Sequence, residues 1–132
     1  MNMSRAITAA GALLAGALLG AASPPAAPQP VAGQCFAMHD VGNHRIGGDR
    51  DLYLNVTGRG VYRLTMANNC LSGAMSSDPL IVRSPNSQSI CRPLDLDLSI
   101  KTSGGIARPC IVASIARLTP AEVAALSPAR RP

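Results

Sequence analysis

The sequence contains very few aromatic residues. Of its 132 residues none is tryptophan, one is phenylalanine and two are tyrosine. Proteins that bind single-stranded nucleic acids stack the bases on aromatic side chains, so this sequence gives little support to a nucleic-acid partner. We expect no nucleic-acid binding and a core built mainly from leucine, isoleucine, valine and methionine.

Several motifs of catalytic and cofactor sites are also missing. The chain has no Gly-x-Ser-x-Gly nucleophile motif and no glycine-rich phosphate loop. Its four cysteines never form Cys-x-x-Cys, which argues against thioredoxin-like exchange and against zinc ribbons. We therefore predict a protein that is not an enzyme and that takes no cofactor and no metal.

Charge is modest and spread along the chain. Charged residues make up 14% of the sequence, the formal net charge is +5, and all but one of the 12 basic residues are arginine. The arginines are scattered rather than clustered, which is typical of a mildly basic soluble surface.

The first 22 residues predict a secretory signal peptide. Arg5 precedes an uncharged run rich in alanine and leucine that ends in Gly20-Ala21-Ala22. This run is shorter than the roughly 20 residues of a spanning helix, and small residues suit signal peptidase. Cleavage after Ala22 fits the apolar run best, with a later cut after Gly33 as the alternative. We expect a periplasmic or secreted protein with no integral membrane span after processing.

Composition divides the remaining chain into four parts. Residues 23–33 predict a proline- and alanine-rich linker, and residues 34–118 predict a disulfide-bonded β domain. Residues 119–127 predict a C-terminal helix, and residues 128–132 a frayed basic tail. A domain of this size buries a limited share of its surface, so disulfides are a plausible supplement to its core.

Alternating hydrophobic and polar residues predict antiparallel strands. Residues 52–56 and 61–66 indicate a hairpin around the glycine-containing turn 57–60, and further strands are predicted at 80–82, 88–91 and 110–118. In the clearest alternation, one face of the predicted strand carries the apolar residues Leu94, Leu96, Leu98 and Ile100. We predict a mainly β fold, either a small antiparallel sheet or a partly closed barrel, stapled by disulfides and carrying one short C-terminal helix.

The helix prediction rests on a capping box. Thr119 is a favourable N-cap, Pro120 suits the first helical position, and Glu122 lies three residues after the cap. The helix should run from Pro120 to about Leu126, because Ser127-Pro128 stops it.

The cysteines predict structural disulfides. Four cysteines allow three pairings. Cys35 opens the first predicted strand and Cys110 opens the last, and terminal strands often become neighbours in small, nearly closed sheets. This argument favours Cys35–Cys110 with Cys70–Cys91, and the other two pairings stay open.

Two groups of polar residues are candidates for chemistry. His39, Asp40 and His44, with Asp49 and Asp51 nearby, have side chains that can bind zinc or copper, but their spacing matches no standard motif. A solvated loop is the better interpretation.

Asp95 and Asp97 form the second group. On a strand they would share one face about 7 Å apart, as an acid–base pair or a calcium site requires. A strand with one buried face must place polar residues on the other, so alternation alone explains both carboxylates.

A set of short segments extends over nearly the whole predicted mature chain. These segments are Cys35-Phe36, Asp49 to Tyr53, Tyr62-Arg63-Leu64-Thr65, Cys70-Leu71, Ile90-Cys91, Arg108 to Val112, Ile115, Leu118-Thr119 and Glu122. In this pattern the chain resembles a family of small exported proteobacterial proteins catalogued as a domain of unknown function. In that family an acidic residue commonly follows the third cysteine closely, whereas here Arg92-Pro93-Leu94 precedes Asp95. The resemblance implies export and a common fold, and it implies no activity.

Three classes of function are consistent with this sequence. The first is a non-enzymatic binding or inhibitory module of the envelope, with an unknown envelope protein or ligand as partner. Its first candidate surface is the loop Ser84 to Ser87, within Ser76 to Ser89, which a Cys70–Cys91 disulfide would restrain. The second class is a structural or stress-related envelope protein. The third is a cryptic enzyme that uses Asp95/Asp97 or His39/His44.

Overall fold

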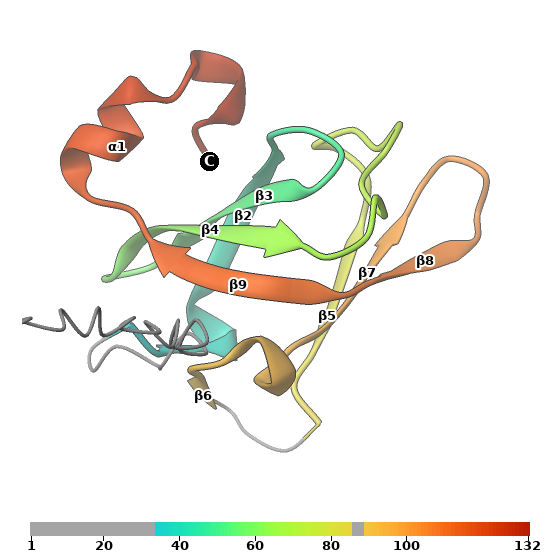
Figure 1. Ribbon diagram of the computed structural model, residues 1–132, viewed down its shortest axis with the longest axis horizontal. Coiled ribbons are helices and arrows are strands. Elements are labelled where there is room, and N and C mark those ends of the chain that lie inside the picture. Colours follow the sequence, from blue (N-terminus) through green and yellow to red (C-terminus); the bar gives the residue numbers. More distant parts are fainter. Residues whose placement is uncertain (1–33, 86–88) are drawn as a thin grey trace, which may run out of the picture.

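The computed structural model describes residues 34–85 and 89–132, so the predicted signal peptide and linker lie outside the described residues (Figure 1). Within this part, nine strands form three antiparallel sheets, accompanied by one α-helix and three 3-10 helices. This confirms the predicted mainly β, disulfide-bonded fold with one short C-terminal helix. The sheets are not closed into a barrel.

The largest sheet has four strands in the order β2-β3-β4-β9. These strands are β2 (Val41–Ile46), β3 (Asp51–Val56), β4 (Gly60–Met66) and β9 (Val112–Arg117). β3 and β4 form the predicted hairpin, with Leu52 opposite Leu64 and all six residues of β3 in register. Gly58 in the turn has a φ of 73°, a conformation that residues with a Cβ rarely adopt. The hairpin therefore follows from local sequence, alternation on either side of a glycine turn.

Two smaller sheets complete the fold. One has the order β5-β7-β8 and contains β5 (Leu80–Arg83), β7 (Asp97–Lys101) and β8 (Ala107–Cys110). The other pairs β1 (Phe36–Ala37) with β6 (Ser89–Ile90). Because Ile111 alone separates β8 from β9, the chain passes directly from the β5-β7-β8 sheet into the largest sheet. The last strand predicted over 110–118 is confirmed over 112–117 as β9, but its predicted start is wrong, because Cys110 ends β8, which pairs with β7 whereas β9 pairs with β4.

The predicted strand over 94–101 begins later than expected. Pro93–Asp95 form a 3-10 helix, η2, and the Leu94 side chain is 87% exposed, so its predicted place on the buried face is wrong. The proline and the capping carboxylate of Asp95 stabilise a turn here, and this local structure overrides the alternation. Leu96, Leu98 and Ile100 are buried as predicted.

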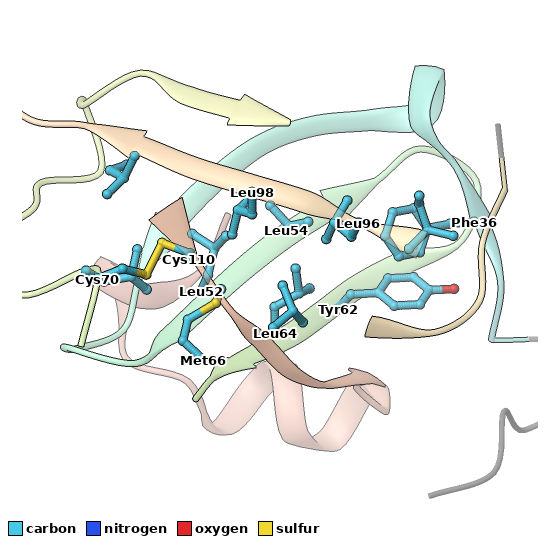
Figure 2. Packing of buried hydrophobic residues seen from close by; sticks show 14 of the residues in the cluster. Phe36, Leu52, Leu54, Tyr62, Leu64, Met66, Cys70, Leu96, Leu98 and Cys110 are labelled. Atoms are coloured by element: carbon cyan, nitrogen blue, oxygen red, sulfur yellow. A yellow bond between two sulfur atoms is a disulfide. The ribbon is translucent and has the colours of Figure 1, made fainter. Parts of the chain in front are cut away.

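The main core lies between the two larger sheets and contains aliphatic side chains and two aromatic rings (Figure 2). The rings of Phe36 and Tyr62 lie with their centroids 4.8 Å apart and their planes tilted by 57°. Tyr53, the third aromatic residue of the chain, is also buried, in a smaller cluster. All three aromatic side chains are therefore used for packing.

The C-terminal helix covers the outer face of the largest sheet. In α1 (Pro120–Ala125), Glu122 N donates to Thr119 Oγ1 at 3.2 Å and Thr119 N donates to Glu122 Oε2 at 2.7 Å, which confirms the capping box. Val123 and Leu126 pack onto the second cluster, which consists of Tyr53, Val61 and Leu118. In residues 34–85 and 89–132, no helix is both long enough and apolar enough to cross a membrane.

The predicted frayed tail is instead ordered against α1. Pro128–Arg130 form the 3-10 helix η3. Arg131 then donates from Nε to Val123 O at 3.2 Å, and from Nη2 to Ala124 O at 2.7 Å and to Leu126 O at 2.8 Å. These bonds add a side-chain donor to the carbonyl groups at the end of α1, of which Val123 O also accepts from Leu126 N.

The two disulfides join Cys35 to Cys91 and Cys70 to Cys110. All four cysteines form structural disulfides as predicted, but the nested pairing of Cys35 with Cys110 and Cys70 with Cys91 is wrong. Cys110 does not open the last strand. It ends β8, so the argument from terminal strands does not apply to it.

Strand register explains the first disulfide. β1 and β6 pair antiparallel with Phe36 opposite Ile90. One step further along each strand, Cys35 therefore meets Cys91, and their Cα atoms are 4.2 Å apart.

Register also explains the second disulfide. β4 and β9 pair antiparallel with Met66 opposite Val112, so the chain after β4 runs beside the chain before β9. Cys70 follows β4 and Cys110 precedes β9, and their Cα atoms are 5.3 Å apart. Both disulfides thus join segments that strand pairing already holds together.

Candidate functional site

A groove lies between β2 and β5, each of which is the edge strand of its sheet. It has a volume of about 300 Å³ and is lined by Met38, Val41, Gly42, His44, Leu80 and Val82. The groove marks the place where the two sheets do not join. Its walls therefore include two strand edges as well as side chains.

Along the open edge of β5, some backbone N–H and C=O groups point toward the groove. Lys101 N donates to Pro79 O at 3.0 Å, which fixes how hydrogen-bonded pairs alternate between β5 and β7. Ile81 belongs to a hydrogen-bonded pair, so its N–H and C=O groups point to β7. Those of Leu80 and Val82 point the opposite way, away from β7.

The edge of β2 behaves in the same manner. Gly47 N donates to Asp51 O at 2.8 Å, so the backbone groups of His44 and Ile46 point away from β3. Ile46 N donates to Ser76 Oγ at 2.9 Å, which holds the segment before β5 against β2. The two edges are thus tied together at one end, and the groove opens beyond that contact.

His44 is the ionisable side chain in the groove. Its Nε2 atom is buried and has no hydrogen-bond partner among the described residues. Burial lowers the pKa of the imidazole below its usual range and the positive charge of Arg45 lowers it further, while a hydrogen bond with the Asp78 backbone opposes them. The neutral form of the imidazole is therefore favoured, and the described part of the chain offers its buried Nε2 atom no partner.

The predicted cluster of ligand-type side chains does not assemble. His39 and Asp40 lie in the 3-10 helix η1 (Met38–Asp40). His39 Nε2 lies 3.4 Å from Asp40 Oδ1, and the His39 side chain is 76% exposed. His44 lies on β2, and Asp51 on β3 accepts a hydrogen bond from Thr65 Oγ1. Asp49 is exposed in the turn between β2 and β3. The interpretation as one solvated loop is wrong, since the other four residues belong to three different elements. The described residues contain no group of three or more histidine, cysteine or acidic side chains arranged to hold a metal ion.

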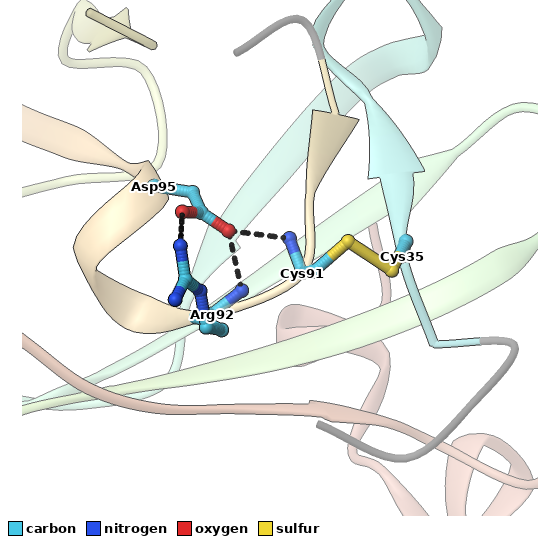
Figure 3. Close-up of a disulfide and its surroundings, with 4 residues drawn as sticks. All are labelled: Cys35, Cys91, Arg92 and Asp95. Atoms are coloured by element: carbon cyan, nitrogen blue, oxygen red, sulfur yellow. Dashed lines mark hydrogen bonds and ion pairs between the residues drawn. A yellow bond between two sulfur atoms is a disulfide. The ribbon is translucent and has the colours of Figure 1, made fainter. Parts of the chain in front are cut away.

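Asp95 and Asp97 do not share a strand face, because Asp95 lies in η2 (Figure 3). Asp95 Oδ2 accepts from Cys91 N at 3.1 Å and from Arg92 N at 2.9 Å, and Arg92 Nη2 donates to Oδ1 at 3.0 Å. The hydrogen bond from the Arg92 side chain is the main reason why the pKa of Asp95 lies below its usual range. These contacts give Asp95 a structural role next to the Cys35–Cys91 disulfide.

The predicted presentation loop is only partly described. Residues 80–83 of the interval Ser76 to Ser89 form β5, and residues 86–88 lie outside the described residues. A Cys70–Cys91 disulfide does not form, so the predicted restraint on this interval is also wrong. The part of the interval that the structure places at a candidate site is β5 itself.

A second pocket lies where the β3–β4 turn, the end of β9 and α1 meet. Its volume is about 400 Å³, and its lining includes Arg59, Val61, Arg117, Leu118, Val123 and Arg131. These arginines are far apart in the sequence and showed no pattern there. The fold alone brings them to one pocket, and no spacing rule would have found it.

Comparisons of the chain with protein-family models, with curated proteins and with solved structures found no match. The resemblance to a family of small exported proteins therefore stays a prediction.

Proposed function

We propose that this protein is an exported, disulfide-bonded binding module of the cell envelope, which binds an extended segment of a partner polypeptide in the groove between β2 and β5. The observation that carries the proposal is the direction of the backbone N–H and C=O groups on the two edge strands. Leu80 and Val82 on β5, and His44 on β2, point backbone groups away from their neighbouring strands at this groove. Open strand edges recruit extended peptides through main-chain hydrogen bonds.

The two disulfides support the proposed location. Disulfides form and persist in oxidising compartments such as the periplasm and the extracellular space. They also hold both ends of the strand array, which limits the conformational entropy that the groove loses when a partner binds.

The side chains that line the groove indicate that the bound segment of the partner is uncharged and apolar. The lining contains methionine, valine, leucine and glycine, and burial favours the neutral form of its single ionisable side chain, His44. A charged residue of the partner would lose its hydration here without gaining an opposite charge. We therefore expect an extended segment rich in β-branched or small apolar residues.

A matched pair of substitutions tests this proposal. The oxidised protein is used to select binders from a displayed library of linear peptides, and the strongest binder is then measured as a synthetic peptide. Val82→Pro removes the outward N–H of β5, whereas Val82→Ala trims the same side chain and keeps that donor. We expect Val82→Pro to weaken peptide binding at least about 3- to 10-fold more than Val82→Ala, as the loss of one hydrogen bond implies.

The same experiment can contradict the proposal in two ways. Equal affinity for both variants, with their folding verified by circular dichroism, would show that the β5 edge does not bind the peptide. Failure of the library to yield any binder whose contacts map to β2 or β5 by NMR would also count against it. Ile106→Ala, at an exposed apolar residue between β7 and β8, serves as a surface control.

A further inference from the structure

The second pocket combines positive charge with an apolar floor. Arg59, Arg117 and Arg131 line it, and none of its lining residues carries a carboxylate. Among the described residues, Arg59 and Arg117 make no ion pair and no side-chain hydrogen bond. Glu122, the acidic residue of α1, forms the capping box with Thr119 and is not among the residues that line the pocket. No carboxylate in the described part of the chain therefore pairs with Arg59, Arg117 or Arg131 at this pocket.

Arg131 is held in a fixed position at the pocket. Its Nε and Nη2 atoms donate to carbonyl groups of Val123, Ala124 and Leu126, at 3.2, 2.7 and 2.8 Å. A guanidinium group has five N–H donors, so the two on Nη1 have no acceptor among the described residues. A cation that is already ordered loses little conformational entropy when it binds an anion.

The floor of the pocket is formed by the small hydrophobic cluster beneath α1. Val61 and Leu118 are each 9% exposed, and Val123 packs against them. An ion without an apolar part would contact the arginines and leave this floor in water. A ligand with an apolar part would cover it and gain the free energy of burial.

We propose that this pocket binds a small amphipathic anion, with a carboxylate, sulfate or phosphate head group at the arginines and an apolar body on the floor. Its volume of about 400 Å³ lies within the range of small-molecule sites, roughly 300–1,000 Å³. The pocket shares no lining residue with the groove between β2 and β5, so this inference goes beyond the proposed function and can fail independently of it.

Dodecanoate is a suitable probe, with two control ligands that each keep half of its chemistry. Acetate has the same head group without the apolar body, and dodecyl maltoside has a similar tail without the charge. We expect dodecanoate below its micelle concentration to bind the oxidised full-length protein, to shift NMR signals of α1 and of the β3–β4 turn, and to bind more weakly as salt rises. Both control ligands should bind at least about tenfold more weakly.

Arginine substitutions locate the binding site. Arg59→Gln and Arg117→Gln should each weaken dodecanoate binding about 3- to 10-fold, the range expected when one exposed charge-assisted contact is lost. Arg83→Gln on β5 removes the same charge away from the pocket and should leave the affinity nearly unchanged. Since Arg59 and Arg117 are exposed, their replacement should not impair folding.

Each other outcome would overturn the inference. Equal binding of dodecyl maltoside would indicate an apolar site without anion recognition, and equal binding of acetate would indicate an anion site without an apolar floor. Equal affinities of Arg117→Gln and Arg83→Gln would place the ligand elsewhere. Binding to phosphatidylglycerol vesicles without binding of monomeric dodecanoate would show that the ligand is a membrane lipid rather than a free amphiphile.

Discussion

Replacing Tyr62 with phenylalanine is expected to stabilise this protein, which is unusual for a change in the core. Tyr62 is 0% exposed, and its hydroxyl oxygen is buried without a hydrogen-bond partner among the described residues (Figure 2). A buried hydroxyl that loses its water and finds no partner costs about 1–3 kcal/mol. The ring itself packs against Phe36 at a centroid distance of 4.8 Å, and phenylalanine keeps this contact.

We therefore expect Tyr62→Phe to raise the free energy of unfolding by about 1 kcal/mol, which corresponds to a Tm increase of about 4–8 °C for a domain of this size. Urea denaturation of the oxidised protein measures the change. Tyr53→Phe is the matched control, because the Tyr53 hydroxyl is not buried without a partner and its removal should bring no such gain. A loss of 1 kcal/mol or more in Tyr62→Phe would mean that the hydroxyl has a stabilising partner, and the reasoning would be wrong.

Two further predictions concern the disulfides and His44. Non-reducing peptide mapping should find Cys35–Cys91 and Cys70–Cys110, and replacing both Cys70 and Cys110 with alanine should cost about 4 kcal/mol, since this bond closes a separation of 40 residues. A Cys35–Cys110 peptide would contradict the fold. Because the folded pKa of His44 lies below its unfolded value of 6.5, the unfolded chain binds more protons as the pH falls through 6.5. Stability should then decrease from about pH 6.5 down to the folded pKa, and His44→Gln should reduce this slope in urea midpoints; an unchanged slope would refute the assignment.

Elements that depend on neighbouring residues could be predicted from the sequence. The β3–β4 hairpin follows from alternation around a glycine turn, and the start of α1 follows from the spacing of Thr119 and Glu122. Each of these signals is carried by residues close together in the sequence, so it can be read without knowing which distant strands pair.

Elements that depend on strand pairing could not be predicted in the same way. Residues 110–118 are rich in isoleucine and valine and look like one strand, but Cys110 belongs to β8, which pairs with β7, whereas β9 pairs with β4, and the break at Ile111 depends on those partners. Strand pairing also determines the disulfide pairing, because each disulfide joins two segments that continue an antiparallel strand pair by a few residues. The prediction from terminal strands failed because Cys110 belongs to β8.

The groove borders an irregular part of β2 that the sequence does not reveal. The register between β2 and β3 shifts between Val41 and His44, which is the signature of a β-bulge. A bulge bends its strand and increases the local twist. Gly42 lies within this interval, and a Cβ there would come within 3.3 Å of Asn55 O, so a residue with a side chain would press β2 away from β3. Val41, Gly42 and His44 all line the groove, so the irregular part of β2 is the part that borders it.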